Sequence, residues 1–171
     1  MSRALLSAGS NLGDRLAHLG GVVEGLGALV ERVSPIYETP PWGDADQPAY
    51  LNLAILADDP AATGPGSWLE RARELERRAG RVRDPERRFG PRTVDVDVIA
   101  VWVDGVPVLS DDPELTLPHP RAHLRAFVLR PWLDVDPGAV LPGHGPVRDL
   151  LADPALRADE RALTPRVESQ G

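Results

Sequence analysis

The sequence predicts an α+β sandwich built around a mainly antiparallel sheet. Segments with the character of strands and helices follow one another without the regular β-α-β alternation of a parallel sheet. Hairpin pairing is indicated twice, between residues 30–38 and 50–57 and between residues 92–103 and 106–109. The length of 171 residues suits one domain with a sizeable core, which we assign to residues 1–152.

The first strand and helix follow from an apolar run and a capping residue. Residues 4–8 predict a buried strand that stops at the turn-forming residues 9–13. Asp14 is placed to cap the helix that comes next. Glycines within this helix each cost about 1 kcal/mol of helix propensity, so packing must hold it together. Its apolar residues recur at spacings of three and four and are Leu16, Leu19, Val23, Leu26 and Val30.

A second helix is expected after the breaker-rich residues 58–66. The run from Ser67 to Glu70 has the form of a capping box that opens the helix, and Gly80 ends it. Residues 81–91 lack any periodicity and predict a long loop. We expect this loop to fold over a bound ligand.

The strongest strand pattern of the chain covers residues 92–103 and leads into a hairpin turn at Asp104-Gly105. Two short helices are expected after it, over residues 127–133 and 147–152. The tail of residues 153–171 is polar, so we expect it to be disordered.

Composition excludes several classes of chemistry. All 19 basic residues are arginine and there is no cysteine, so a P-loop lysine, a Schiff base, a thiol nucleophile and a disulfide framework are absent. The four histidines are scattered, which disfavours a histidine metal site. No apolar run approaches the roughly 18 residues of a membrane span, and no signal peptide is recognisable. A cytoplasmic location is therefore expected.

The charge of the chain is unevenly distributed. Residues 71–92 hold nine arginines and four acids and carry +5. Because the whole chain carries −7, the rest carries −12. An acidic molecule disfavours binding to nucleic acid or an anionic membrane. A basic segment within it points to a local anionic ligand.

Two carboxylates lie within the strongest strand. Residues two apart in a strand face the same way, so Asp95 and Asp97 are expected to share a face with Ile99 and Val101. Apolar residues on both faces predict a central strand. The two carboxylates, with Cβ atoms about 7 Å apart, could jointly hold one or two Mg²⁺ ions. The alternative is an amphipathic strand with a solvated acidic face, which the apolar continuation of that face disfavours.

Arginines beside an acidic pair indicate phosphoryl or pyrophosphoryl transfer, because guanidinium groups and metal ions together neutralise phosphate charge. The alternative is that the arginines form a solvated helix face. Pairs four residues apart, such as Arg73 with Arg77 and Glu70 with Glu74, carry like charges and disfavour that alternative. We therefore expect an anionic ligand to offset these arginines.

Six motifs in the chain together resemble the 6-hydroxymethyl-7,8-dihydropterin pyrophosphokinase family of folate biosynthesis. They occur in the family's order between residue 4 and about residue 152. The motifs are residues 9–13 (Gly-Ser-Asn-Leu-Gly), 37–43, 46–52, 80–83, 88–97 and 117–121. The resemblance implies a ferredoxin-like α/β/α sandwich, and transfer of the β,γ-pyrophosphoryl group of ATP to the pterin hydroxymethyl group with release of AMP.

By this resemblance, Asp95 and Asp97 are the ligands of two Mg²⁺ ions that bridge the triphosphate of ATP, the co-substrate. Arg83 and Arg92 match arginines that contact the phosphates, and they complete the expected catalytic set with the two carboxylates. The remaining expected ATP contacts match the family's loop and nucleotide positions and are Arg73, Glu76, Arg81, Arg88, Phe89, Val98, His119 and Arg125.

The resemblance also implies a pterin pocket. A flat heteroaromatic ring binds between π-faces and to a few amide-type donors and acceptors. Tyr50 and Phe127 would enclose the ring, and Asn52 would hydrogen-bond to it. For Trp42 the residues leave two alternatives, a pocket wall or a surface contact, of which we favour the wall. The expected pocket residues are Thr39, Pro41, Trp42, Tyr50, Asn52 and Phe127.

Three positions depart from the family pattern and concern single ATP contacts rather than the reaction. Phe89 stands where a Trp is common, Pro120 where members can have an aromatic residue, and Arg73 where some have an amide.

Two other function classes stay open from the sequence. One is a catalytically silent pterin- or nucleotide-binding relative, which the intact acids and arginines disfavour. The other is a ferredoxin-like RNA-binding module, which the acidic remainder of the chain disfavours. For the enzyme we expect small-molecule substrates, a monomer, and no nucleic-acid or membrane partner. Asp97 is also a candidate general base, although a metal-bound carboxylate is a weak one.

Overall fold

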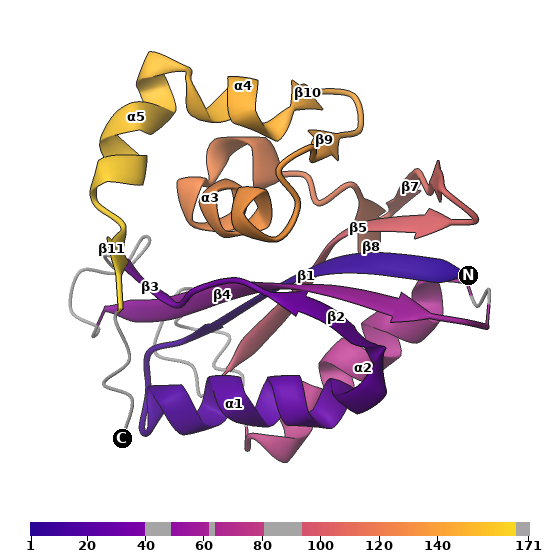
Figure 1. Cartoon of the computed structure of the whole chain (residues 1–171). Helices are drawn as coiled ribbons and strands as arrows, with labels where there is room; N and C mark the ends of the chain where they lie inside the picture. Colours follow the sequence, from indigo (N-terminus) through magenta and orange to yellow (C-terminus); the bar gives the residue numbers. More distant parts are fainter. Residues whose placement is uncertain (40–48, 62–63, 81–93, 167–171) are drawn as a thin grey trace.

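A computed structural model describes residues 1–39, 49–61, 64–80 and 94–166 of the chain. A seven-stranded sheet separates two layers of helices (Figure 1). The strand β1 (Ser2–Ser10) lies between β4 (Tyr50–Asp59) and β5 (Asp95–Val103), and both pairings are antiparallel. On the far side of β4 lie β2 (Val30–Val33) and β3 (Tyr37–Thr39).

The helices cover the two faces of the sheet. α1 (Arg15–Leu26) and α2 (Pro65–Arg78) lie on one face, and α3 (Ala126–Val135) lies on the other (Figure 1). From β1 to β5 the order of strands and helices is β-α-β-β-β-α-β. Because β2 and β3 both pair with β4, they take the place of one strand in the β-α-β-β-α-β order of a ferredoxin-like fold. The predicted α+β class is therefore confirmed. None of the helices in the described part of the chain is long and apolar enough to cross a membrane.

Shorter elements join and extend this framework. They are the 3₁₀ turns η1 (Gly27–Leu29) and η2 (Ala122–Leu124), the strands β6 (Val106–Pro107), β7 (Ser110–Asp112), β8 (Leu115–Leu117), β9 (Val140–Leu141), β10 (Gly145–Pro146) and β11 (Thr164–Pro165), and the helices α4 (Val147–Leu151) and α5 (Pro154–Arg161).

The helix caps agree with the sequence in one case and not in the other. Asp14 caps α1, because its Oδ1 accepts a hydrogen bond from the Ala17 N–H at 3.1 Å. The predicted capping box at Ser67 is wrong. α2 already begins at Pro65, a residue that suits the first turn because it has no N–H to satisfy, and Gly64 is the N-cap.

The sheet holds two separate cores, one on each face. On the α1/α2 face, Leu6, Leu53 and Trp68 are buried, and the Trp68 Nε1 donates to Ser2 Oγ at 2.7 Å. On the α3 face, Leu129 and Trp132 are among the large side chains that are fully buried. The apolar residues of β1 and of β4 from Leu51 to Ala57 therefore pack into one core or the other.

A β-bulge in β5 changes the predicted faces of that strand. Leu5 pairs with Ala100 but Leu6 pairs with Val98, so Ile99 is an extra residue. Ile99 faces α3 as predicted for the side of Asp95 and Asp97, but the bulge turns Val101 into the α1/α2 core. The expectation that Val101 shares the acidic face is wrong. β5 is also not a central strand. It pairs with β1 along most of its length, but on its other side only Trp102 and Val103 pair with β6, the last strand of the sheet.

The expectation of a disordered tail after Asp153 is wrong for residues 154–165. Asp153 caps α5 by accepting from the Ala155 N–H at 2.9 Å, and Pro154 occupies its first turn. Leu156 and Leu163 are buried in the α3-side core, and β11 pairs with β3. The polar composition was misleading because two apolar residues and one strand pairing are sufficient to anchor this segment.

Candidate active site

Directly paired residues form a row across one end of the sheet. Asp95 lies opposite Gly9, Gly9 opposite Asn52, and Asn52 opposite Tyr37. Residues paired across antiparallel strands point to the same face. Tyr37 packs into the core beneath α3, so the whole row faces that helix. The expected metal ligand Asp95 and the expected pterin residue Asn52 are thus separated by a single glycine.

Gly9 provides the space that the Asn52 side chain occupies. A Cβ atom on Gly9 would lie 2.7 Å from Asn52 Oδ1, closer than real contacts allow, and 3.5 Å from the Tyr50 ring. Asn52 is buried and its Nδ2 donates to Thr39 Oγ1 at 2.8 Å. The structure therefore brings together three of the expected pterin residues, Thr39, Tyr50 and Asn52.

The two carboxylates are partly exposed on the same face. Asp97 lies two residues further along β5 than Asp95, and it is paired with Ser7 as Asp95 is paired with Gly9. No cluster of three histidine or acidic side chains that could hold a metal occurs among the described residues. An acidic pair nevertheless suits Mg²⁺, which is usually held by one or two carboxylates together with substrate phosphates and water.

His119 lies beside this acidic end of the site. Its backbone N–H donates to the Ile99 carbonyl at 2.8 Å, and its Nδ1 accepts from the Arg121 N–H at 3.2 Å. That contact assigns the ring proton to Nε2. Burial lowers the pKa of His119 to about 4; the Arg125 charge adds to this, and the Asp95 charge opposes it. The imidazole is therefore neutral at pH 7.

Arg125 and Phe127 lie together at the start of α3. Arg125 precedes the first residue of α3, and its guanidinium lies over the Phe127 ring, 5.5 Å from the ring centroid. Phe127 packs at the edge of the α3-side core and remains partly exposed. The expected nucleotide residue Arg125 thus lies next to the expected pterin residue Phe127.

Glu76 and Val98 are held inside the protein. Glu76 in α2 is 6% exposed, and its Oε2 accepts from the Val96 N–H at 3.0 Å. Val98 points into the α1/α2 core. The structure gives Glu76 a role in anchoring the acidic half of β5. Contacts of Glu76 and Val98 with ATP stay predictions.

The arginines of α2 are offset by acids of the chain itself. Arg71 pairs with Asp59 at 2.7 Å and Arg73 with Glu114 at 3.6 Å. Arg77 and Arg78 both pair with Glu74 on the same helix, at 2.5 and 3.4 Å. The expectation that these arginines require an anionic ligand is wrong for α2, because acids three and four residues away on the helix and acids of other segments already pair with them.

This arrangement, an amide and an aromatic side chain beside an acidic pair, can be compared with known proteins. A family model described as 7,8-dihydro-6-hydroxymethylpterin-pyrophosphokinase matches residues 5–137. The chain belongs to this family. Its sequence is 51% identical over 175 residues to the 2-amino-4-hydroxy-6-hydroxymethyldihydropteridine pyrophosphokinase of Mycobacterium tuberculosis, covering 96% of this chain and 92% of that protein.

More distant pyrophosphokinases of the same name also match. The protein of Methylorubrum extorquens is 44% identical, over 89% of this chain and 93% of its own length. That of Bacillus subtilis is 36% identical over 77% of each chain. A crystal structure of Plasmodium falciparum HPPK-DHPS superposes with a TM-score of 0.64 at 12% identity, over 94% of this chain and 46% of that chain. That likeness shows the pyrophosphokinase fold alone.

Several expected site residues lie outside the described part of this pyrophosphokinase. They are Pro41, Trp42, Arg81, Arg83, Arg88, Phe89 and Arg92. Two residues that form the site were not singled out from the sequence, Gly9 as a packing residue and Tyr37. What identifies them is their pairing with Asn52 across neighbouring strands. That pairing depends on strand register, which a single sequence does not specify.

Proposed function

We propose that the protein transfers a pyrophosphoryl group from ATP to 6-hydroxymethyl-7,8-dihydropterin, giving the pterin diphosphate and AMP. The observation that carries the proposal is the paired row Asn52, Gly9 and Asp95, which places the buried Asn52 amide one residue away from the acidic pair. Membership of the pyrophosphokinase family supports the same reaction.

The pterin would bind at the Asn52 end of the row. Tyr50 and Phe127 supply aromatic faces that suit a flat ring. Asn52 has two N–H groups, and the hydrogen bond to Thr39 uses one of them. That bond holds the amide plane, so the other N–H and Oδ1 are pre-oriented for a heterocycle.

The phosphates would bind at the acidic end. Asp95 and Asp97 would hold Mg²⁺, two ions by analogy with the family, and the metal charge would neutralise the triphosphate. Arg125 adds a fixed positive charge. The neutral imidazole of His119 can donate a hydrogen bond from its Nε2–H to a phosphate oxygen. Arg92, three residues before Asp95 in the chain, is proposed to contact the same phosphates, as is Arg83.

The reaction would then be a direct displacement. The oxygen of the pterin hydroxymethyl group attacks the β-phosphorus, the bond from that phosphorus to the α,β-bridging oxygen breaks, and AMP leaves with the bridging oxygen. The hydroxyl proton passes to water or to a neighbouring carboxylate. The protein contributes orientation and charge neutralisation, which are the main sources of catalysis in phosphoryl transfer.

The test is AMP formation from ATP and Mg²⁺, with and without the pterin. Pterin-dependent AMP together with pterin diphosphate is the expected result. ADP instead would indicate an ordinary kinase on this fold, and ATP binding without turnover would favour a silent relative. The predicted cytoplasmic location and monomeric state stay predictions.

Asp97→Asn tests the role of the carboxylate pair. The substitution keeps the shape of the side chain but removes its charge, so we expect kcat to fall at least 100-fold, equivalent to about 3 kcal/mol of transition-state stabilisation. Asp111→Asn, an exposed acid on β7, is the matched control and should leave kcat unchanged. Near-normal turnover of the Asp97 variant would contradict the metal assignment.

A further inference from the structure

The segment after residue 153 extends the sheet next to the strand that carries Thr39. Thr164 and Pro165 of β11 pair with Glu38 and Tyr37 of β3. The Arg166 N–H continues the pairing by donating to the Ile36 carbonyl at 2.8 Å. This segment lies beyond residue 137, where the match to the family model ends.

The pairing accommodates proline at β11. Hydrogen-bonded and non-hydrogen-bonded pairs alternate in an antiparallel ladder. Because Arg166 bonds to Ile36, the neighbouring pair of Pro165 and Tyr37 is a non-hydrogen-bonded one. The N–H that proline lacks is therefore not needed there. β11 thus forms a regular edge strand along β3.

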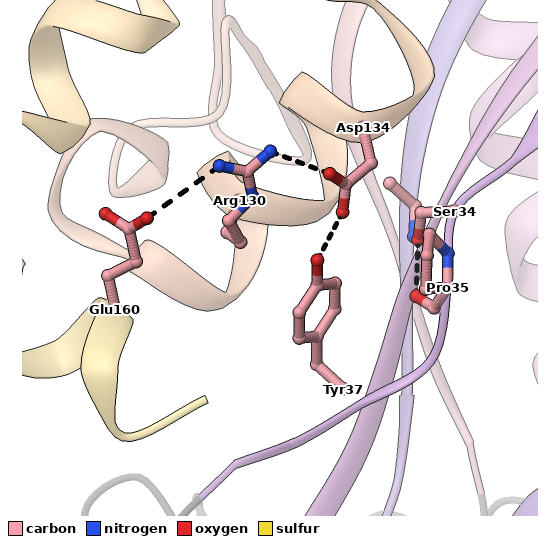
Figure 2. Close-up of polar contacts among 7 residues, drawn as sticks. Ser34, Pro35, Tyr37, Arg130, Asp134 and Glu160 are labelled. Carbon is pink, nitrogen blue, oxygen red and sulfur yellow. Dashed lines mark hydrogen bonds and ion pairs between the residues drawn. The ribbon is translucent and has the colours of Figure 1, made fainter. Parts of the chain in front are cut away.

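Side chains of α3 also hold β3, from the face of the sheet. The Tyr37 hydroxyl donates to Asp134 Oδ2 of α3, and Arg130 binds Asp134 Oδ1 at 2.7 Å (Figure 2). Arg130 also faces Glu160 of α5 at 3.8 Å. Burial raises the pKa of Tyr37 to about 12, and the hydrogen bond to Asp134 adds to the effect. The phenol therefore stays a donor throughout the physiological pH range.

Tyr37 is directly opposite Asn52 and two residues before Thr39. Since β3 is only three residues long, its position depends on the strands and side chains on either side of it. A shift of β3 would change the distance between Thr39 Oγ1 and Asn52 Nδ2, which is 2.8 Å. The orientation of the Asn52 amide is thus coupled to the contacts of Tyr37 and β11.

We propose that Tyr37, held by Asp134 and by the added strand β11, is a positioning residue for the Thr39–Asn52 pair of the pterin site. The inference rests on the proposed function, because it assigns the consequence to pterin binding. It also gives the segment of residues 153–166, outside the family match, a part in substrate affinity.

Tyr37→Phe and Arg166→Pro test the two contacts separately. The first removes the phenol hydroxyl, and the second removes the N–H that bonds to Ile36. In steady-state assays we expect the KM for the pterin to rise about 5-fold in each variant, while the KM for ATP and kcat change less than 2-fold. A role in stability alone would leave the KM for the pterin unchanged.

Matched variants separate positioning from a general loss of stability. Arg166→Ala keeps the backbone N–H and should behave as the unaltered protein. Asp134→Asn keeps an acceptor for Tyr37 and should retain most of the pterin affinity that Asp134→Ala loses. Ser2→Ala removes another buried side-chain contact, with Trp68, at the opposite end of β1, and should leave both KM values unchanged.

Pterin-dependent AMP formation by the unaltered chain is measured first. Its absence overturns the proposed function and this inference with it. With an active enzyme, an unchanged pterin KM in Tyr37→Phe and Arg166→Pro, or an equal rise in the KM for ATP, overturns the positioning role alone.

Discussion

Because Gly9 has no side chain, the two proposed substrate subsites can lie close together. Asp95 and Asn52 are both paired with Gly9, so the proposed pterin and phosphate ends of the site meet across one residue. Any larger residue would displace the Asn52 amide, because the added Cβ would lie 2.7 Å from its Oδ1. Here glycine is required for space rather than for an unusual backbone conformation.

Gly9→Ala tests this at the residue scale. We expect pterin affinity to fall about 10-fold, about 1.4 kcal/mol, because the Asn52 amide must move to admit the methyl group. Titration calorimetry with the pterin measures the change. Gly20→Ala is the control, since nothing lies within 4 Å of the added Cβ, and it should leave affinity unaltered. Normal binding by Gly9→Ala would contradict the contact.

The residues of the candidate site were only partly predictable from the sequence. The alternation of Asp95 and Asp97 within an apolar strand indicated a shared face, and the structure confirms it. The positions of Gly9 and Tyr37 opposite Asn52 depend on strand register, which is set by pairing between segments more than 40 residues apart in the case of Gly9.

At the scale of elements, α2 supports the acidic half of β5 through one buried carboxylate. Val96 lies between Asp95 and Asp97, and its N–H donates to Glu76. Without that acceptor, a backbone N–H at the edge of the sheet would be left without its partner, at a cost of about 1–3 kcal/mol. The position of the two proposed metal ligands therefore depends on a helix from the opposite face.

Comparing Glu76→Gln with Glu76→Ala distinguishes this anchoring role from an ATP contact that requires charge. The glutamine keeps an acceptor for the Val96 N–H, so we expect it to retain kcat within about 3-fold, whereas alanine should lower kcat about 10-fold and stability by about 1–3 kcal/mol. Steady-state kinetics and chemical denaturation measure both. Equal losses of ATP affinity in the two variants would favour a charge contact with the nucleotide.

The elements that the sequence predicted best are those with strong local signals. The cap at Asp14, the strand of residues 50–57 and the turn at Asp104-Gly105 all agree with the structure. The predicted strand of residues 30–38 is instead two strands, because Pro35 interrupts it and Ser34 takes over pairing with Ala54 through both its N–H and its Oγ. The bulge at Ile99 and the anchoring of α5 depend on tertiary packing, which leaves no local pattern.

At the scale of the whole molecule, a single sheet supports both cores. Leu19 lies in the α1/α2 core and Leu129 in the α3-side core, and both are fully buried. The strands β1 and β4 contribute alternate residues to each core, so neither layer of helices can detach without exposing one face of the same strands. This arrangement predicts cooperative unfolding of the two layers.

Leu19→Ala and Leu129→Ala test that cooperativity. Each removes a fully buried side chain, and we expect each to lower the free energy of unfolding by about 2–5 kcal/mol. Denaturant titrations followed by circular dichroism and by tryptophan fluorescence should keep coincident midpoints in both variants, with Trp68 reporting on one core and Trp132 on the other. Leu109→Ala, at a position 71% exposed, is the control and should not shift the midpoint. If either variant splits the transition, the two faces of the sheet unfold independently, and the active site, which is assembled from β5 and α3, would lose its geometry before the molecule as a whole unfolds.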